Sequence, residues 1–165
     1  MRYLIISDIH SNFEALRAVL VSSKGDYDEI VCCGDLVGYG PDPDLVTDWV
    51  RANVPQVVRG NHDRACSGLD SADQFNEAAR LAAYWNQTHL SPENTQYLMT
   101  LPAGPMEIAE QFVILHGSPR DEDEYVTASA EAAECFPMLK HPVTFFGHTH
   151  LQGGFLRTAA TRRNP

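Results

Sequence analysis

The sequence predicts an α/β fold in which short buried strands alternate with amphipathic helices. Five apolar runs with β-branched content have the length and composition of buried strands, and helix-start signals follow the first of them. Each run also leads into a residue that can bind a metal ion. In a sheet whose strands run the same way, such residues share one edge, which is where α/β folds place their sites. The five runs are residues 3–7, 29–33, 56–59, 111–115 and 143–146.

The first half of the chain reads as repeated strand–loop–helix units. After the first strand, residues 11–14 have the spacing of a capping box that opens a helix, and Leu16 lies on the apolar face of that helix. The second strand leads into a glycine-rich loop at residues 34–41. A helix is predicted at residues 43–53, and Pro55 ends it before the third strand begins. This order is that of βαβ units.

A largely helical insert is predicted at about residues 64–103, where it shapes the mouth of the site. Residues 64–70 are expected to form a flexible loop, residues 71–74 have capping-box spacing, and Pro92 stands at the first position of a second helix. A hairpin, another helix, the last strand and a possible further strand start come next. We expect one domain over residues 1–165. The later elements are predicted at residues 106–109, 111–115, 128–140, 143–146 and 153–156.

Composition and charge limit the class of protein. With 44% hydrophobic and 21% charged residues in 165, the composition is that of an ordinary globular domain. A net charge of −10 argues against long contact with a nucleic-acid backbone, which needs clustered lysine and arginine. It does not exclude a small phosphorylated substrate, because bound metals can invert the local field. No apolar run approaches membrane-spanning length, and the first strand begins without a secretion signal, so we expect a soluble, cytoplasmic protein.

The four cysteines are interpreted as reduced, buried small residues. Cys32 and Cys33 are adjacent within an apolar strand, so their side chains should point to opposite faces and cannot easily pair with each other or share one metal. Cys66 and Cys135 stand alone in the sequence. Reduced thiols agree with a reducing cytoplasm.

Five of the seven histidines follow the apolar runs, beside glycine or a carboxylate. Taken singly, each motif has an ordinary alternative, because Asp8 near His10, Asp35 after a glycine and the polar run 61–63 are all typical of turns. Chance is a poor explanation for all of them together. The five are His10, His62, His116, His148 and His150, while His89 is interpreted as a surface or packing residue and His141 is left out of the site.

The donor types at these positions indicate a centre with two metals. Imidazole, carboxylate and amide oxygen suit first-row divalent ions such as Mn, Fe, Zn or Co. The donors outnumber the three or four protein ligands of one catalytic zinc. If Asp8 and Asp35 are the only charged ligands, two divalent ions keep a formal charge of about +2, which favours a phosphate oxyanion and in-line displacement at phosphorus. His62 followed by Asp63 has the arrangement that acid–base work needs.

The ordered motifs resemble those of the calcineurin-like metallophosphoesterase superfamily. Residues 34–41 and 116–120 further resemble its small prokaryotic branch of phosphodiesterases and phosphatases. The resemblance implies a four-layer αββα sandwich of two mixed β-sheets flanked by helices, with a dinuclear centre at the sheet edges. The motifs are Asp8-x-His10, Gly34-Asp35, Gly60-Asn61-His62-Asp63, His116 and Gly147-His148-x-His150.

The resemblance also implies a role for each site residue. Asp35 would bridge two divalent metals, and a metal-bridging hydroxide would be the nucleophile. His62 would protonate the leaving oxygen or stabilise its charge, and Asp63 would orient it. Manganese is expected, with Fe, Zn, Co, Ni or Mg as alternatives. One metal would be held by Asp8, His10 and His150, and the other by Asn61, His116 and His148.

The expected function is metal-dependent hydrolysis of phosphate mono- or diesters, by a phosphodiesterase or phosphatase that acts on a small substrate. The alternative is a non-catalytic, metal-binding scaffold or interaction protein on the same fold, although such scaffolds tend to lose the acid histidine or a ligand. A more distant alternative is a dinuclear hydrolase that acts on a carbon centre. Similar family members continue past the Gly-His-x-His block, whereas this chain stops about 15 residues after it. We therefore expect that half to be short, or to be completed by another copy in a homo-oligomer.

Overall fold

The computed structural model describes residues 1–158, and residues 159–165 lie outside the described part. Strands and helices alternate through the first half, as the sequence predicts. In chain order the elements are β1 (Tyr3–Ile6), α1 (Phe13–Ser22), β2 (Glu29–Cys32), α2 (Pro43–Asn53), β3 (Gln56–Val57), α3 (Asn61–Ser67), α4 (Glu77–His89), α5 (Pro92–Thr100), β4 (Met106–Ile108), β5 (Phe112–Ile114), α6 (Ser129–Cys135), the 3₁₀ turn η1 (Phe136–Met138) and β6 (Thr144–Phe145).

The strands form two three-stranded sheets, ordered β1-β2-β3 and β4-β5-β6. All pairs in the first sheet are parallel, so the carboxyl ends of its strands meet at one edge, as predicted. In the second sheet, β4 and β5 form the predicted antiparallel hairpin, and β6 runs parallel to β5. The second sheet is therefore mixed as expected, whereas the described strands of the first sheet make only parallel pairs.

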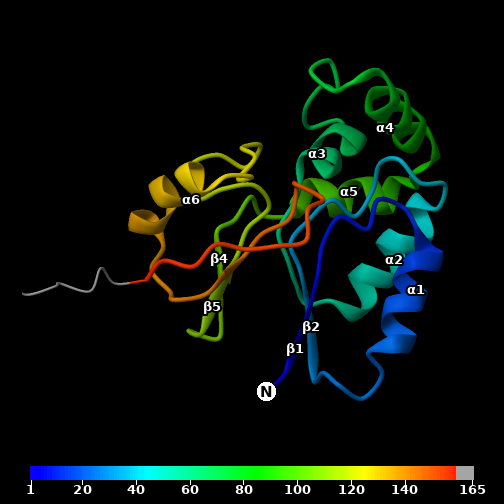
Figure 1. The fold of residues 1–165 in the computed structure, drawn as a ribbon. Helices are drawn as coiled ribbons and strands as arrows, with labels where there is room; N and C mark the ends of the chain where they lie inside the picture. The colour runs from blue at the N-terminus through cyan, green and yellow to red at the C-terminus, as the bar shows by residue number, and fades with distance from the viewer. Residues whose placement is uncertain (159–165) are drawn as a thin grey trace, which may run out of the picture.

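Helices and sheets stack in four layers, which confirms the predicted sandwich (Figure 1). Three apolar cores fill the spaces between these layers. Helices α1 and α2 cover the outer side of the first sheet, and α6 lies beyond the second. Side chains along β2 alternate between the two faces of the sheet, so this strand contributes to two cores. Ile30 and Cys32 pack toward the helices, whereas Val31 and Cys33 pack between the sheets. The third core lies under α6 and includes Val126.

Helix α3 begins at Asn61, where we predicted loops over residues 60–70. The Asp63 carboxylate accepts a hydrogen bond from the Gly60 N–H (2.9 Å), which satisfies a free donor at the helix start. Gly68 ends the helix in the left-handed conformation, with a φ of 83°. The helix has only seven residues, so its hydrophobic periodicity is too short to be read from the sequence.

Several element boundaries also differ from the predictions. Helix α4 starts at Glu77 with an Asn76 cap, later than the capping-box spacing at residues 71–74 indicated. Helix α6 stops at Cys135 and continues as a 3₁₀ turn that contains Pro137, because proline cannot donate the hydrogen bond of a longer helix. Residues 153–156 form no strand in the described part of the chain.

All four cysteines are buried and free, as predicted. Cys32 and Cys33 do face different cores, so the adjacent pair is divided between the two sides of the sheet. Among residues 1–158, no helix has both the length and the apolar character needed to cross a membrane.

Candidate metal centre

The seven predicted ligands come together where the strands of both sheets end. Donor atoms of six of them form two clusters, and His62 forms a further group with His10 and Asp35. Asn61 joins the second cluster, since its Oδ1 lies 3.2 Å from the Nε2 of His116. The clusters contain Asp8, His10 and His150 on one side, and Asp35, His116 and His148 on the other.

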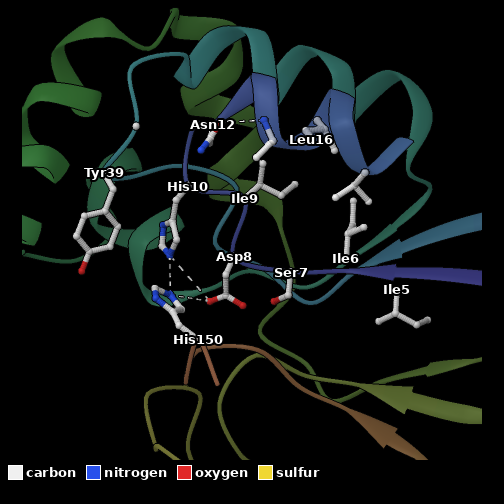
Figure 2. A pocket seen from close by; sticks show the side chains of 13 residues that line it. Ile5, Ile6, Ser7, Asp8, Ile9, His10, Asn12, Leu16, Tyr39 and His150 are labelled. Carbon is white, nitrogen blue, oxygen red and sulfur yellow. Dashed lines mark hydrogen bonds and ion pairs between the residues drawn. The ribbon is translucent and has the colours of Figure 1, made fainter. Parts of the chain in front are cut away.

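The first cluster opens toward solvent. The Nε2 atoms of His10 and His150 are 2.9 Å apart, and the Nε2 of His150 lies 3.3 Å from an Asp8 carboxylate oxygen. Figure 2 shows these three side chains pointing toward one another. The His150 side chain is 49% exposed, so a small molecule can reach the donors from this side. A cavity of about 740 Å³ adjoins them, with apolar walls that include Ile6 and Leu16 (Figure 2).

Asp35 lies between the two clusters. One of its carboxylate oxygens, Oδ2, is 3.3 Å from the Nε2 of His116 and 3.6 Å from the Nε2 of His10. The other, Oδ1, accepts a hydrogen bond from the His62 N–H (2.9 Å). Its carboxylate is thus fixed on one side and faces imidazoles from both clusters on the other.

Three imidazoles each have one nitrogen occupied by a main-chain carbonyl. His10 Nδ1 lies 3.0 Å from the Val37 oxygen, and His116 Nδ1 lies 2.8 Å from the Cys33 oxygen. His148 uses its other nitrogen, Nε2, which lies 3.0 Å from the Asp123 oxygen. Because a carbonyl can only accept, each of these nitrogens carries a proton, so the second nitrogen is the one that could offer a lone pair to a metal. This pattern fits a set of metal ligands.

The backbone is left-handed at five of the seven predicted ligands, with φ between 50° and 68°. Such angles are uncommon outside glycine and cost on the order of 1–3 kcal/mol per residue. Strain of this kind persists where the surrounding structure enforces it, and it concentrates at functional sites. No periodicity in the sequence predicts it. The five residues are Asp8, His10, Asp35, His148 and His150.

Two glycines allow the chain to pass close to the aspartate ligands. A Cβ at Gly60 would lie 2.1 Å from Oδ1 of Asp35, and one at Gly147 would lie 2.5 Å from Oδ2 of Asp8. Such distances are far below van der Waals contact, so any larger residue would displace a carboxylate. The glycines in these two motifs therefore have a steric role.

Asp35 and His116 form a buried pair of opposite charge. Burial disfavours the charged form of both groups, but their mutual attraction outweighs it. The pKa of the Asp35 carboxyl is lowered below its ordinary value, and that of the His116 imidazole is raised to about 9. A divalent cation at the same donors would replace the His116 proton, so metal binding there would release protons.

His62 is held by aromatic packing. Its ring lies between Tyr39, at a centroid distance of 4.8 Å, and Phe75, at 4.6 Å. Its Nδ1 is buried and has no hydrogen-bond partner among residues 1–158, and a Cβ at Gly38 would lie 2.3 Å from that atom. Burial lowers the pKa of the imidazole to about 4.

Asp63 does not contact His62 in the way that the sequence led us to expect. Its carboxylate is fully buried and accepts hydrogen bonds from the main-chain N–H groups of four residues at 2.8–3.3 Å. Both oxygens are therefore committed to the backbone, and Asp63 fixes the loop that carries Asp35. Burial, and next the Asp35 carboxylate, raise the pKa of its carboxyl group. The four donors belong to Asp35, Leu36, Val37 and Gly60.

An ion-pair network fixes the loop that supports His148. Arg64 contacts Glu122 at 2.6 Å and Asp123 at 2.5 Å, and Arg59 contacts Glu122 at 2.9 Å. The Asp123 carbonyl faces the His148 ring, so the network holds the group that orients this imidazole. The sequence offered no signal for these pairs, because the partners are about 60 residues apart.

Asn86 is a further buried residue that the sequence did not identify. From α4, its Oδ1 accepts hydrogen bonds from the Ser11 hydroxyl (2.7 Å) and the Gly38 N–H (3.0 Å). Its Nδ2 donates to the carbonyls of Gly40 and Ala82. This one amide therefore joins the insert to the loops that carry His10 and Asp35.

Replacing Asn86 by leucine is expected to lower the free energy of unfolding by about 2–4 kcal/mol, because it leaves buried donors without acceptors. Urea unfolding of the metal-free protein would measure this change. Gln87→Leu is the matched control, since Gln87 is the exposed neighbour on the same helix. Equal stability of the two variants would contradict the joining role of Asn86.

Comparison with known proteins gives a consistent result. Residues 1–152 match the family model for calcineurin-like phosphoesterases. A metallophosphoesterase from Sphaerobacter thermophilus of known crystal structure is 45% identical, with a TM-score of 0.78, and the match covers 91% of this chain and 61% of that one. An uncharacterised protein of Methanocaldococcus jannaschii is 41% identical over 89% of this chain and 61% of its own length.

A more distant relative has a named activity. The symmetrical bis(5'-nucleosyl)-tetraphosphatase of Erwinia tasmaniensis is 27% identical over 84% of this chain and 52% of its own length. The chain thus spans between about half and three fifths of the length of these three relatives.

Proposed function

We propose that this protein, which belongs to the calcineurin-like phosphoesterase family, hydrolyses phosphate mono- or diesters with two divalent metal ions. The observation that carries the proposal is the convergence of carboxylate, imidazole and amide donors at one edge of the two sheets. Three of the imidazoles have one nitrogen bound to a main-chain carbonyl, and the other nitrogen would bind a metal. The nitrogen and oxygen donor set fits first-row divalent ions, of which we expect manganese.

Each ligand would have a defined place. Asp35 would be shared, because its carboxylate faces imidazoles of both clusters. When bound, the metal ions would supply positive charge that polarises a phosphoryl oxygen and activates a water molecule. One ion would be held by Asp8, His10 and His150, and the other by Asn61, His116 and His148.

His62 is the proposed group that stabilises the leaving oxygen. One of its ring nitrogens lies within 4.8 Å of donor atoms of His10 and Asp35. The ring is fixed between Tyr39 and Phe75, so its orientation is set before substrate binds. Its lowered pKa makes it a neutral N–H donor at neutral pH, which can form a hydrogen bond to an oxygen that gains negative charge.

The alternative is a metal-binding scaffold without activity. The described residues favour the enzyme, because the seven ligand side chains are all at the centre and His62 is beside them. The decisive experiment is hydrolysis of p-nitrophenyl phosphate and bis-p-nitrophenyl phosphate with Mn²⁺, and with EDTA as the control. Turnover that EDTA abolishes supports the enzyme, and the ratio of the two rates separates monoester from diester preference. Bound metal without turnover would favour the scaffold.

His62→Ala is expected to lower kcat about 100- to 1,000-fold while metal affinity stays within a few-fold, because the side chain is assigned no metal. Metal titration by calorimetry and turnover with Mn²⁺ would be measured on the same preparation. His89→Ala is the matched control, as His89 is an exposed imidazole on α4. Loss of metal binding in His62→Ala would instead make His62 a ligand.

A further inference from the structure

Two half-exposed tyrosines border the metal centre. Tyr39 is 46% exposed, and its ring centroid lies 4.8 Å from those of both His10 and His62. Tyr125 is 56% exposed and stacks on His148 at 3.8 Å, with an interplanar angle of 28°. Each ring thus packs against a histidine of the centre while much of its surface remains in water. Figure 2 shows Tyr39 beside the His10 and His150 side chains.

The two rings are held in place by the loops that carry them. Tyr39 has a left-handed backbone (φ 56°) between two glycines, and a Cβ at Gly40 would lie 2.4 Å from the His10 carbonyl oxygen. Tyr125 follows the loop fixed by the Arg64 ion pairs. The pair is therefore preorganised, which lowers the entropy lost on binding a ligand.

The arginines of the neighbouring loops are already neutralised. Arg59 and Arg64 pair with Glu122 and Asp123, and Arg120 pairs with Glu124 and Glu134. These side chains are thus committed to carboxylates of the protein. Beside the candidate metal ligands, the groups that these loops would present to the organic part of an ester are the rings of Tyr39 and Tyr125.

We propose that Tyr39 and Tyr125 form a subsite that stacks a planar aromatic group, a nucleobase or another aryl ring, attached to the phosphate that the centre holds. This inference rests on the proposed phosphoesterase function and adds the class of ester. Stacking of bases on aromatic side chains is favourable and tolerant of base identity, because every base has a π face. The subsite should therefore favour aromatic esters without selecting one base.

The test compares ligands that differ only in the aromatic group. Adenosine 5'-monophosphate and ribose 5-phosphate share the sugar and the phosphate, and phenyl phosphate supplies an aryl ring without a sugar. Their affinities for the Zn²⁺-loaded protein would be measured by calorimetry and by saturation-transfer NMR. We expect the nucleotide to bind about tenfold more tightly than ribose 5-phosphate. Phenyl phosphate then separates a general aryl preference from a nucleobase preference.

Variants test whether the two tyrosine rings cause this difference in affinity. Tyr39→Leu and Tyr125→Leu should each reduce the tenfold ratio between the affinities for adenosine 5'-monophosphate and ribose 5-phosphate. Tyr39→Phe and Tyr125→Phe should keep this ratio, because the ring remains. Tyr84→Leu is the matched control, since Tyr84 is a half-exposed tyrosine on α4. A ratio near one in the wild-type protein, or a ratio that survives both leucine substitutions, would overturn the subsite.

The outcome also separates this inference from the proposed function. Metal-dependent hydrolysis of p-nitrophenyl substrates together with equal affinities for the two sugar phosphates would refute the aromatic subsite alone. Absence of metal-dependent turnover and of phosphate binding would refute both, because the rings act on an ester that the centre anchors.

Discussion

Asp35→Asn is expected to reduce metal-dependent phosphoesterase turnover by about 1,000-fold or more, the largest effect on activity that we predict. The carboxylate lies between both clusters, 3.3 Å from a His116 nitrogen and 3.6 Å from a His10 nitrogen. An amide keeps the size of the side chain but removes its charge, so two divalent ions would lose one of the two anionic ligands proposed for them. Both ions should bind more weakly.

Metal binding can be measured separately from turnover in this variant. A ligand that binds only the folded state raises the melting temperature, so Mn²⁺ should stabilise the wild-type protein. Asp35→Asn should lose most of that rise. Asp26→Asn removes the same charge from the turn between α1 and β2 and should behave like the wild type. An unchanged metal-induced rise in Asp35→Asn would contradict the shared-ligand role.

The convergence of the candidate ligand residues can be predicted from the sequence, because strand geometry determines it. Parallel strands place their carboxyl ends together, so a polar residue just after Cys33 and another after Val58 must lie near each other. The same rule brings His116 and His148 together beyond β5 and β6. Hydrophobic runs followed by polar residues are local signals, and such signals can be read from one sequence.

Features that depend on tertiary contacts could not be read in this way. Nothing near Asn86 in the sequence indicates that its amide holds loops 46 and 75 residues away. The short helix α3 depends on Asp63 as a cap. The left-handed backbone at Asp8 accompanies contacts with other parts of the chain, among them the hydrogen bond from the Asp8 N–H to the Gly34 carbonyl.

Asp63→Ala is expected to produce the largest loss of stability, about 3–5 kcal/mol in the free energy of unfolding. Four buried main-chain N–H groups would lose their acceptor at once. A typical domain is stable by only about 5–15 kcal/mol, so the variant should approach global unfolding at moderate temperature. Urea unfolding of the metal-free protein measures the change, and Asp26→Ala supplies the control for loss of one acidic residue.

The same variant distinguishes two roles for Asp63. If its carboxylate acted by orienting His62, replacement would lower turnover and leave the stability of the metal-free protein nearly unchanged. Since the carboxylate is bound to the backbone of the loop that carries Asp35, we expect a large loss of stability instead of a selective loss of turnover. Stability should fall before any metal is added, and metal affinity should fall with it. Asp63→Asn refines the comparison, because its amide keeps one acceptor oxygen but turns an NH₂ group toward N–H donors, so its loss of stability should be of similar size.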